Sequence, residues 1–352
     1  MRILQINSER GWRGGERQTL LTAQGLRDRG HDVALLVRAG GVLETRARDS
    51  GLRTYTVNTI AQFGGWLASH GRSYDVLHVQ TANVLAWALL AKLLHRRPVV
   101  FSRRTSFPIR GFSGFSRLKW ASTDVRVAIS EAAADAMRGM RLSVHIIPSA
   151  VPAVVSNPAR VQAFIEREQL HGQRLVGTAA ALSPEKDPVT LIHAAARVCA
   201  RYPDVTFVHW GAEGAAADAA RRAIHDLGLD MRYRLLGFES DVEQLFPALK
   251  VFVMSSRHEA LGSSVLDAMV QRVPVVATQV GGLKELLADG RGLLSAPGDV
   301  SGLADQIEVQ LGDPEGGLAM AARAFDEVRT RYGVQTMVQA YERLYQQVLV
   351  PS

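Results

Sequence analysis

Short apolar runs alternate with segments of helical periodicity along most of the chain. In the first half, the apolar runs lie at residues 3–6, 33–37, 76–79, 99–101, 125–129 and 145–147. A second series begins at Leu175 and continues through the runs VTFVHW, YRLLGF, VFVMSS and VPVVAT. Segments with apolar positions at helical spacing separate the runs, for example residues 16–30, 187–202 and 241–250. This alternation is typical of parallel, doubly wound sheets, so each series predicts one α/β domain.

The two series are separated by a stretch with little periodicity, IPSAVPAVVSNPAR, which contains three prolines and is predicted to be an interdomain linker. We therefore expect an N-terminal domain at residues 1–152 and a C-terminal domain at residues 153–333. A final helix at residues 334–349 is expected to pack back on the first domain. Open α/β sheets bind ligands at the carboxyl ends of their strands, so two Rossmann-like domains facing a cleft predict a two-substrate site.

Composition places the protein among soluble globular proteins. Of 352 residues, 47% are hydrophobic and 21% are charged, and no uncharged apolar run of 18 residues could span a bilayer. The opening MRILQINSER has too short an apolar run for a signal peptide, so we expect no export. The single cysteine, Cys199, excludes an intrachain disulfide and fits a reducing compartment. A cytoplasmic location is the expectation.

The segment SSRHEALGSSVLDAM places two carboxylates, Glu259 and Asp267, on either side of small residues, directly after an apolar strand. Gly262 permits close approach of the backbone, and Ser263 and Ser264 would open a helix whose first amides lack intrahelical acceptors, which favours an anion site. Carboxylates repel phosphate but accept hydrogen bonds from hydroxyls. The layout suits a phosphate ligand with polyol groups on both sides, such as a nucleoside diphosphate sugar. The alternative is an ordinary helix start with a solvated aspartate.

The run EALGSSVLDAMVQRVPVVATQVGGLKELL resembles the donor-sugar signature of family 4 glycosyltransferases (glycosyltransferase group 1), which have the two-domain GT-B fold. The resemblance extends over nearly the whole chain, through GGER, RGHDV, DVLHVQ, VAISEAA, IIPSA, ALSPEKD and LLGFESDV. It implies a retaining, sugar-nucleotide-dependent hexosyltransferase in which the leaving diphosphate takes the proton of the acceptor.

The resemblance also implies roles for individual residues. Glu259 matches an acid that contacts the transferred hexose, and Asp267 matches a second acid, usually Glu, that binds the ribose hydroxyls. Lys186 in SPEKD matches a lysine that neutralises the donor diphosphate, a role that suits a flexible point charge. The remaining donor-site residues that the resemblance implies are Gly14 and Gly15, in the loop after the first strand, and Phe238 in LLGFESDV.

The sequence departs from the family pattern at two charged positions. The family commonly has an arginine a few residues before the lysine, whereas residues 179–181 are all alanine. Arg104 stands where the family often has a histidine near the transferred sugar, and a permanently charged guanidinium would bind sugar or phosphate rather than act as a base. No Asp-x-Asp pair occurs, so we expect neither a metal nor another cofactor, and the substrate is expected to be a UDP- or GDP-sugar.

The positive charge is concentrated in one segment. The net charge is +7, and residues 76–123 contain eight lysines and arginines but no Asp or Glu. Such a segment favours an anionic partner: nucleic acid, an acidic membrane or a phosphorylated substrate. Within residues 103–120, basic and aromatic residues are interleaved, which favours an anionic bilayer; nucleic acid is not expected, because no groove-reading module accompanies the segment. The acceptor- or membrane-contacting candidates are Arg103, Arg110, Phe112, Phe115, Arg117, Lys119 and Trp120.

Together these features predict a retaining glycosyltransferase that acts on a cell-envelope glycolipid or lipopolysaccharide-type acceptor, as a peripheral protein at the inner face of the cell membrane. Two alternatives remain open at this point: a glycosyltransferase with a soluble acceptor, and a non-catalytic subunit that binds sugar nucleotides.

Overall fold

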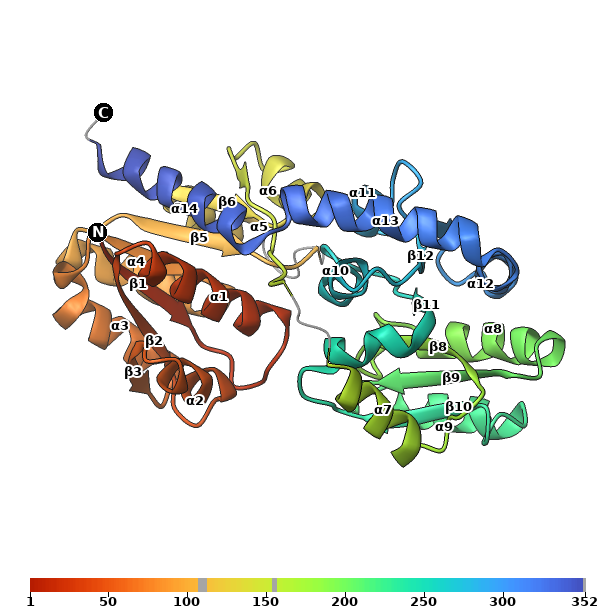
Figure 1. Ribbon diagram of the computed structural model, residues 1–352. Helices are drawn as coiled ribbons and strands as arrows, with labels where there is room; N and C mark the ends of the chain where they lie inside the picture. The colour runs from red at the N-terminus through yellow and green to blue at the C-terminus, as the bar shows by residue number, and fades with distance from the viewer. Residues whose placement is uncertain (107–112, 154–156, 351–352) are drawn as a thin grey trace. The chain divides into compact units, whose positions relative to one another are not determined.

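The structure, a computed structural model, describes residues 1–106, 113–153 and 157–350 (Figure 1). It divides into two compact units. Unit 1 comprises Met1–Ala150 together with Tyr332–Ser352, and unit 2 comprises Val151–Arg331. The chain therefore leaves the first unit once and returns to it through its last helix.

Unit 1 is built on a seven-stranded parallel sheet with the strand order β3-β2-β1-β4-β5-β6-β7. The strands are β1 (Arg2–Asn7), β2 (Asp32–Arg38), β3 (Arg53–Val57), β4 (Val76–Val79), β5 (Val99–Arg103), β6 (Val125–Ala128) and β7 (His145–Ile146). The central strands are buried on both faces, as expected for a sheet covered by helices on both sides.

The helices of unit 1 connect these strands and include the C-terminal helix. They are α1 (Gly14–Asp28), α2 (Val42–Asp49), α3 (Ile60–His70), the short 3₁₀ helix η1 (Gly71–Ser73), α4 (Ala82–His95), α5 (Ser113–Ala121), α6 (Glu131–Arg138) and α14 (Val334–Leu349). Helix α14 packs on α1, and Gly25 makes this possible, because a Cβ there would lie 2.4 Å from Val338 Cγ2. The end of the chain is thus part of the core of unit 1.

Unit 2 has a six-stranded parallel sheet with the order β10-β9-β8-β11-β12-β13. Its strands are β8 (Arg174–Ala179), β9 (Val205–Trp210), β10 (Tyr233–Gly237), β11 (Leu249–Met254), β12 (Val275–Thr278) and β13 (Leu293–Ser295). Its helices are α7 (Pro158–Arg167), α8 (Pro188–Arg201), α9 (Ala217–Asp226), the 3₁₀ helix η2 (Val242–Ala248), α10 (Ser263–Val270), α11 (Leu283–Leu286), α12 (Val300–Gly312) and α13 (Pro314–Arg331). The strand order reverses between β8 and β11.

The predicted architecture of two doubly wound α/β domains is confirmed. Strands β3 and β13 were not predicted from the apolar runs, since one alternates with polar residues and the other has three residues. Residues 158–160, assigned to the linker, open helix α7, whose first turn is capped by the Asn157 side chain. The helix expected at residues 241–250 is a 3₁₀ helix, which Pro247 explains. None of the helices in the described residues is long and apolar enough to span a membrane.

Candidate active site

The loops that follow β8 and β11 lie side by side in unit 2, at the point where the strand order reverses. The Arg257 amide donates to Glu185 O at 2.8 Å, and Ser255 Oγ donates to Lys186 O at 2.9 Å. In open α/β sheets, ligands bind in the crevice formed at such a switch point, beyond the carboxyl ends of the strands. The side chains of these two loops are therefore the candidates for binding a ligand.

Lys186 and Glu259 meet at this position. The Lys186 ammonium donates to Glu259 Oε2 and forms an ion pair with it. Ser256 Oγ donates to the same carboxylate oxygen at 3.4 Å. Both charged side chains are partly exposed, the lysine at 25% and the glutamate at 13%, so each remains within reach of a ligand. The structure thus joins the two residues that the sequence assigned to the diphosphate and to the hexose.

The backbone of Glu259 is held by the turn that follows β12. The Gly282 amide donates to Glu259 O at 3.2 Å, and a Cβ on Gly281 would lie only 1.8 Å from that oxygen. Gly281 also has φ +46°, so a side chain at this position is excluded both by backbone conformation and by space. The GG turn of the signature therefore fixes the position of the acid.

Helix α10 begins immediately after this loop. Gly262 is its N-cap with φ +100°, and a Cβ there would lie 2.6 Å from Leu283 Cδ2, so the start of the helix is closely packed. Ser263 and Ser264 are its first two residues, as predicted, and their amides form part of the positive end of the helix. Asp267 follows on the second turn and is 6% exposed. A lysine and a helix N-terminus in adjacent loops provide a binding arrangement for phosphate.

An arginine beside Lys186 was missed by the sequence reasoning. Arg257 Nε donates to Asp187 Oδ2 at 2.7 Å. Asp187 is the N-cap of α8, and its buried carboxylate also accepts from the Thr190 hydroxyl at 2.8 Å. Arg257 therefore holds a guanidinium on the residue that follows Lys186, whereas residues 179–181 provide no arginine. The contact joins residues that are 70 positions apart in the sequence. The only sequence signal for a role of Arg257 in the site was its position two residues before Glu259.

Phe238 lies away from this pair. It follows the last residue of β10 and is largely exposed, and β9 separates β10 from β8. The structure therefore puts Phe238 at the same carboxyl edge of the sheet as Lys186, but two strands away.

In unit 1, Arg104 lies against Gly15. Arg104 directly follows β5, and a Cβ on Gly15 would lie 3.7 Å from Arg104 Cδ. The guanidinium donates two N–H groups to Gln80 Oε1, at 3.0 and 2.7 Å, and one to Ser149 Oγ at 3.2 Å. Burial lowers the pKa of Arg104. Gly14 and Gly15 are the first residues of α1 rather than part of the preceding loop, which corrects that prediction.

Beneath Arg104 lies a buried network of polar side chains. His78 contacts Tyr345 OH through Nδ1 at 2.6 Å and Ser102 Oγ through Nε2 at 2.7 Å, and Tyr341 OH lies 3.0 Å from Ser102 Oγ. Burial, with a smaller contribution from the Arg104 charge, holds the pKa of His78 well below its ordinary value. His78 is therefore a neutral, structural histidine. The tyrosines come from α14, and their spacing of four residues was the available sequence signal for this network.

The basic-aromatic segment is only partly a surface. Trp120 is 5% exposed and belongs to the core of unit 1, and the buried Arg103 guanidinium lies 5.1 Å from the centre of its ring. Neither side chain can reach a bilayer in this fold, which corrects the membrane assignment for both. Phe115 and Arg117 are exposed on α5, and Lys119 is half-buried with Nζ 3.3 Å from Ala82 O. Arg110 and Phe112 lie outside the described residues.

Two parallel-sheet domains, the second with a lysine, a glutamate and a helix N-terminus at its switch point, define the GT-B class. Residues 12–154 match the family model described as Glycosyltransferase Family 4, and residues 161–326 match the model described as Glycosyl transferases group 1. The chain therefore belongs to the group 1, or family 4, glycosyltransferases, and the resemblance drawn from the sequence is confirmed.

Several curated proteins are similar to the chain. The lipopolysaccharide core biosynthesis glycosyltransferase LpsE of Rhizobium meliloti is 30% identical over 56% of this chain and 50% of its own length. The 2-deoxystreptamine glucosyltransferase of Streptomyces kanamyceticus is 30% identical over 54% of this chain and 51% of its length. The lipopolysaccharide core biosynthesis mannosyltransferase LpcC of Rhizobium leguminosarum bv. viciae is 26% identical over 81% of this chain and 82% of its own length. The aligned chain thus spans about half the length of the first two relatives.

Among solved structures, Anabaena HepE in complex with UDP and glucose superposes with a TM-score of 0.89. The superposition covers 99% of this chain and all of that one, at 23% sequence identity. This similarity confirms the GT-B fold.

Proposed function

We propose that the protein transfers a hexose from a UDP- or GDP-sugar, with retention of configuration, to a cell-envelope glycolipid or lipopolysaccharide-type acceptor. The observation that carries the proposal is the meeting of Lys186 and Glu259 at the switch point of unit 2, beside the N-terminus of α10. The Lys186 ammonium suits a diphosphate, and the Glu259 carboxylate suits the hydroxyls of a sugar.

In this proposal, each charged group of the site has one task. Lys186 and the first amides of α10 bind the diphosphate and stabilise the negative charge that develops on it as the bond to the sugar breaks. Glu259 accepts hydrogen bonds from the hexose, and Asp267 accepts them from the ribose. No metal is assigned a role, because the lysine and the helix amides supply the positive field.

The transfer step is balanced within the two substrates. The bond between the anomeric carbon and the diphosphate oxygen breaks, and a new bond forms from the acceptor oxygen to the same face of the sugar. The leaving diphosphate oxygen takes the acceptor proton. Arg104 is assigned to hold the sugar or a phosphate, because a guanidinium has only N–H donors and no acceptor for a proton.

The acceptor class is supported by the relatives. LpsE and LpcC are both named for lipopolysaccharide core biosynthesis. The UDP and glucose in the HepE structure support the sugar-nucleotide donor instead. We place the reaction at the cytoplasmic face of the membrane, where Phe115 and Arg117 on α5 offer an exposed aromatic ring and an exposed charge to an anionic surface.

A soluble acceptor is the second candidate, and the similarity to a 2-deoxystreptamine glucosyltransferase favours it. Transfer assays separate the two: extraction of radioactive sugar into organic solvent, with envelope lipids as acceptors, supports the first candidate. Transfer only to water-soluble acceptors supports the second. Donor binding without hydrolysis or transfer would instead identify a non-catalytic binding subunit.

The donor is identified by a thermal-shift panel of UDP- and GDP-sugars. A ligand that binds only the folded protein stabilises it by about 2.7 kcal/mol at a hundred times its dissociation constant, which raises the melting temperature measurably. The proposal predicts a shift with one sugar nucleotide and a smaller shift with the corresponding nucleoside monophosphate. If none of these nucleotides shifts the melting temperature, the proposed donor site is wrong.

A further inference from the structure

Helix α4 is apolar on the side that faces solvent. Its inward face packs through Val84, Leu85 and Ala88. On the outward face, Leu90, Leu93 and Leu94 are 64%, 81% and 55% exposed. A helix that is hydrophobic all round usually has a partner on each side, and a cluster of large exposed leucines is unusual on a surface that meets only water.

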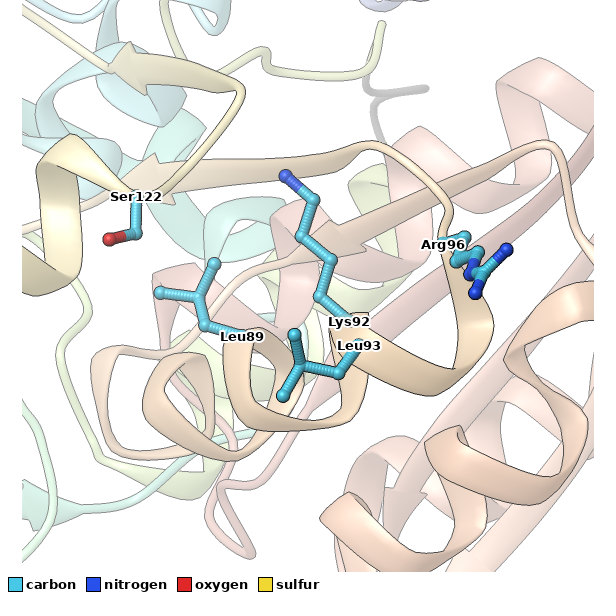
Figure 2. Close-up of a pocket in the computed structure, with 5 residues that line it drawn as sticks. All are labelled: Leu89, Lys92, Leu93, Arg96 and Ser122. Carbon is cyan, nitrogen blue, oxygen red and sulfur yellow. The ribbon is translucent and has the colours of Figure 1, made fainter.

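A groove runs beside this face. It is lined by Leu89, Lys92 and Leu93 of α4, by Arg96 at the end of the helix, and by Ser122 just beyond α5 (Figure 2). Figure 2 shows the apolar side chains of Leu89 and Leu93 with the cationic side chains of Lys92 and Arg96 on the same stretch of helix. The groove therefore combines an apolar surface with positive charge.

Three arginines lie at the C-terminal end of α4, beside the exposed leucines. Arg72 Nε donates to Leu94 O at 2.6 Å, and Arg97 donates to Arg72 O at 3.2 and 2.9 Å, so both lie at the C-terminal end of α4 together with Arg96. Within residues 1–106, 113–153 and 157–350, no carboxylate forms an ion pair with any of these three arginines. Lys92 is neutralised, since it pairs with Asp124 at 2.6 Å.

We propose that the outward face of α4, which we call the α4 leucine face (Leu90, Leu93 and Leu94 with Arg96), docks on an anionic lipid bilayer. The inference deepens the proposed function and rests on its membrane-bound acceptor. Leucines insert at the boundary between headgroups and acyl chains, while arginines beside them bind acidic headgroups. A second copy of the chain fits less well, because α4 carries no Asp or Glu that could pair with the arginines of the other copy in a symmetric contact.

The matched test uses flotation with vesicles of phosphatidylglycerol and phosphatidylethanolamine, against vesicles of phosphatidylcholine alone. The wild type is expected to float with the anionic vesicles. The triple variant Leu90→Ser, Leu93→Ser and Leu94→Ser is expected to lose at least about tenfold in partition coefficient, which corresponds to about 1.4 kcal/mol. Its side chains are exposed, so folding is preserved, and an unchanged melting temperature verifies this. The control replaces the exposed Leu318 and Met231 of unit 2 with Ser and should float like the wild type.

The charge is tested separately. Arg96 has φ +55°, which asparagine adopts readily, so Arg96→Asn removes the charge without straining the turn. This variant should need lower salt for the same binding, because screening shortens the reach of the remaining charges. The exposed Arg222 of unit 2, changed to Gln, is the control and should leave the salt dependence unchanged.

Contact is located with a fluorophore. In a Cys199→Ala background, a polarity-sensitive dye on Leu93→Cys should brighten on anionic vesicles and be quenched by brominated lipid, whereas the dye on Leu318→Cys should not respond. Absence of wild-type binding at low ionic strength would overturn the inference, as would binding that survives the triple leucine variant. A dimer in sedimentation that the leucine variant abolishes, without vesicle binding, would assign the face to a second copy. Sugar-nucleotide binding by unit 2, measured on the same samples, keeps a failure of this inference distinct from a failure of the proposed function.

Discussion

The ammonium of Lys186 is paired with the carboxylate of Glu259. The proposed site gives these residues different partners, the diphosphate for the lysine and the hexose for the glutamate. A phosphate that binds Lys186 must therefore compete with Glu259 for the same charge. In the proposed site this pair couples sugar binding to diphosphate binding, since a hexose that engaged Glu259 would also free the lysine for the phosphates.

Removing the charge of Glu259 should separate nucleotide binding from transfer. We expect Glu259→Gln to bind UDP or GDP at least as tightly as the wild type, because Lys186 no longer has an internal competitor. Transfer should fall about ten- to a hundredfold, as expected for the loss of a charged hydrogen bond of about 1.5–3 kcal/mol. Calorimetric binding of the nucleotide and initial rates of transfer are the two measurements. Unchanged transfer by a folded variant would remove Glu259 from the sugar site.

Asp267 is the residue proposed for the ribose. Asp267→Asn keeps the size of this buried side chain but gives up one acceptor oxygen, so nucleotide affinity should fall roughly tenfold while the melting temperature changes little. Comparison of a ribonucleotide with its 2′-deoxy analogue supplies the control, since the wild type should discriminate between them more strongly than the variant. Equal affinities for wild type and variant would place the ribose elsewhere.

The fold and the position of the α10 N-terminus follow from local sequence pattern. Apolar runs of three to six residues predicted the central strands, and the small residues Gly262–Ser264 predicted the start of α10. The pairing of Lys186 with Glu259 and of Arg257 with Asp187 depends on which strands are neighbours in the sheet. No local pattern carries that information. Trp120 was assigned to the surface but is buried. An aromatic residue within a basic segment gives no indication of which side of its helix is buried.

The C-terminal helix should stabilise unit 1 through a single hydroxyl. Tyr345 OH contacts His78 Nδ1 at 2.6 Å and accepts from Gln5 Nε2 at 3.2 Å. Tyr345→Phe leaves both buried groups with fewer partners, so the free energy of unfolding should fall by about 1–3 kcal/mol. The control is Tyr202, whose hydroxyl has no hydrogen bond among the described residues. Tyr202→Phe should change the free energy of unfolding by less than about 0.5 kcal/mol. Equal effects in urea unfolding would contradict the role of the network.

Acid should destabilise unit 2 through His209. This buried histidine contacts Ala180 O and Tyr233 OH, each at 2.9 Å, and burial lowers its pKa from 6.5 to about 4. Between these values the unfolded chain binds a proton that the folded chain does not. The contribution is therefore complete above pH 6.5 and is lost as the pH falls towards 4, up to about 3 kcal/mol.

The matching variant is His209→Gln, which retains a donor and an acceptor but does not titrate. Urea unfolding of both proteins between pH 7 and pH 4 should show a shallower decline for the variant, whatever its stability at neutral pH. Parallel declines would show that another group accounts for the acid sensitivity.

The donor site is tested most directly by calorimetric titration of the wild type and of Lys186→Ala with a nucleoside diphosphate and with the corresponding monophosphate. In the proposed site the lysine lies against the distal phosphate, so the variant should lose at least about tenfold in affinity for the diphosphate and little for the monophosphate. Lys186→Arg is the control for charge and should retain most of the difference between the two nucleotides. Equal losses for both nucleotides, or diphosphate binding that does not change in Lys186→Ala, would contradict the proposed donor site.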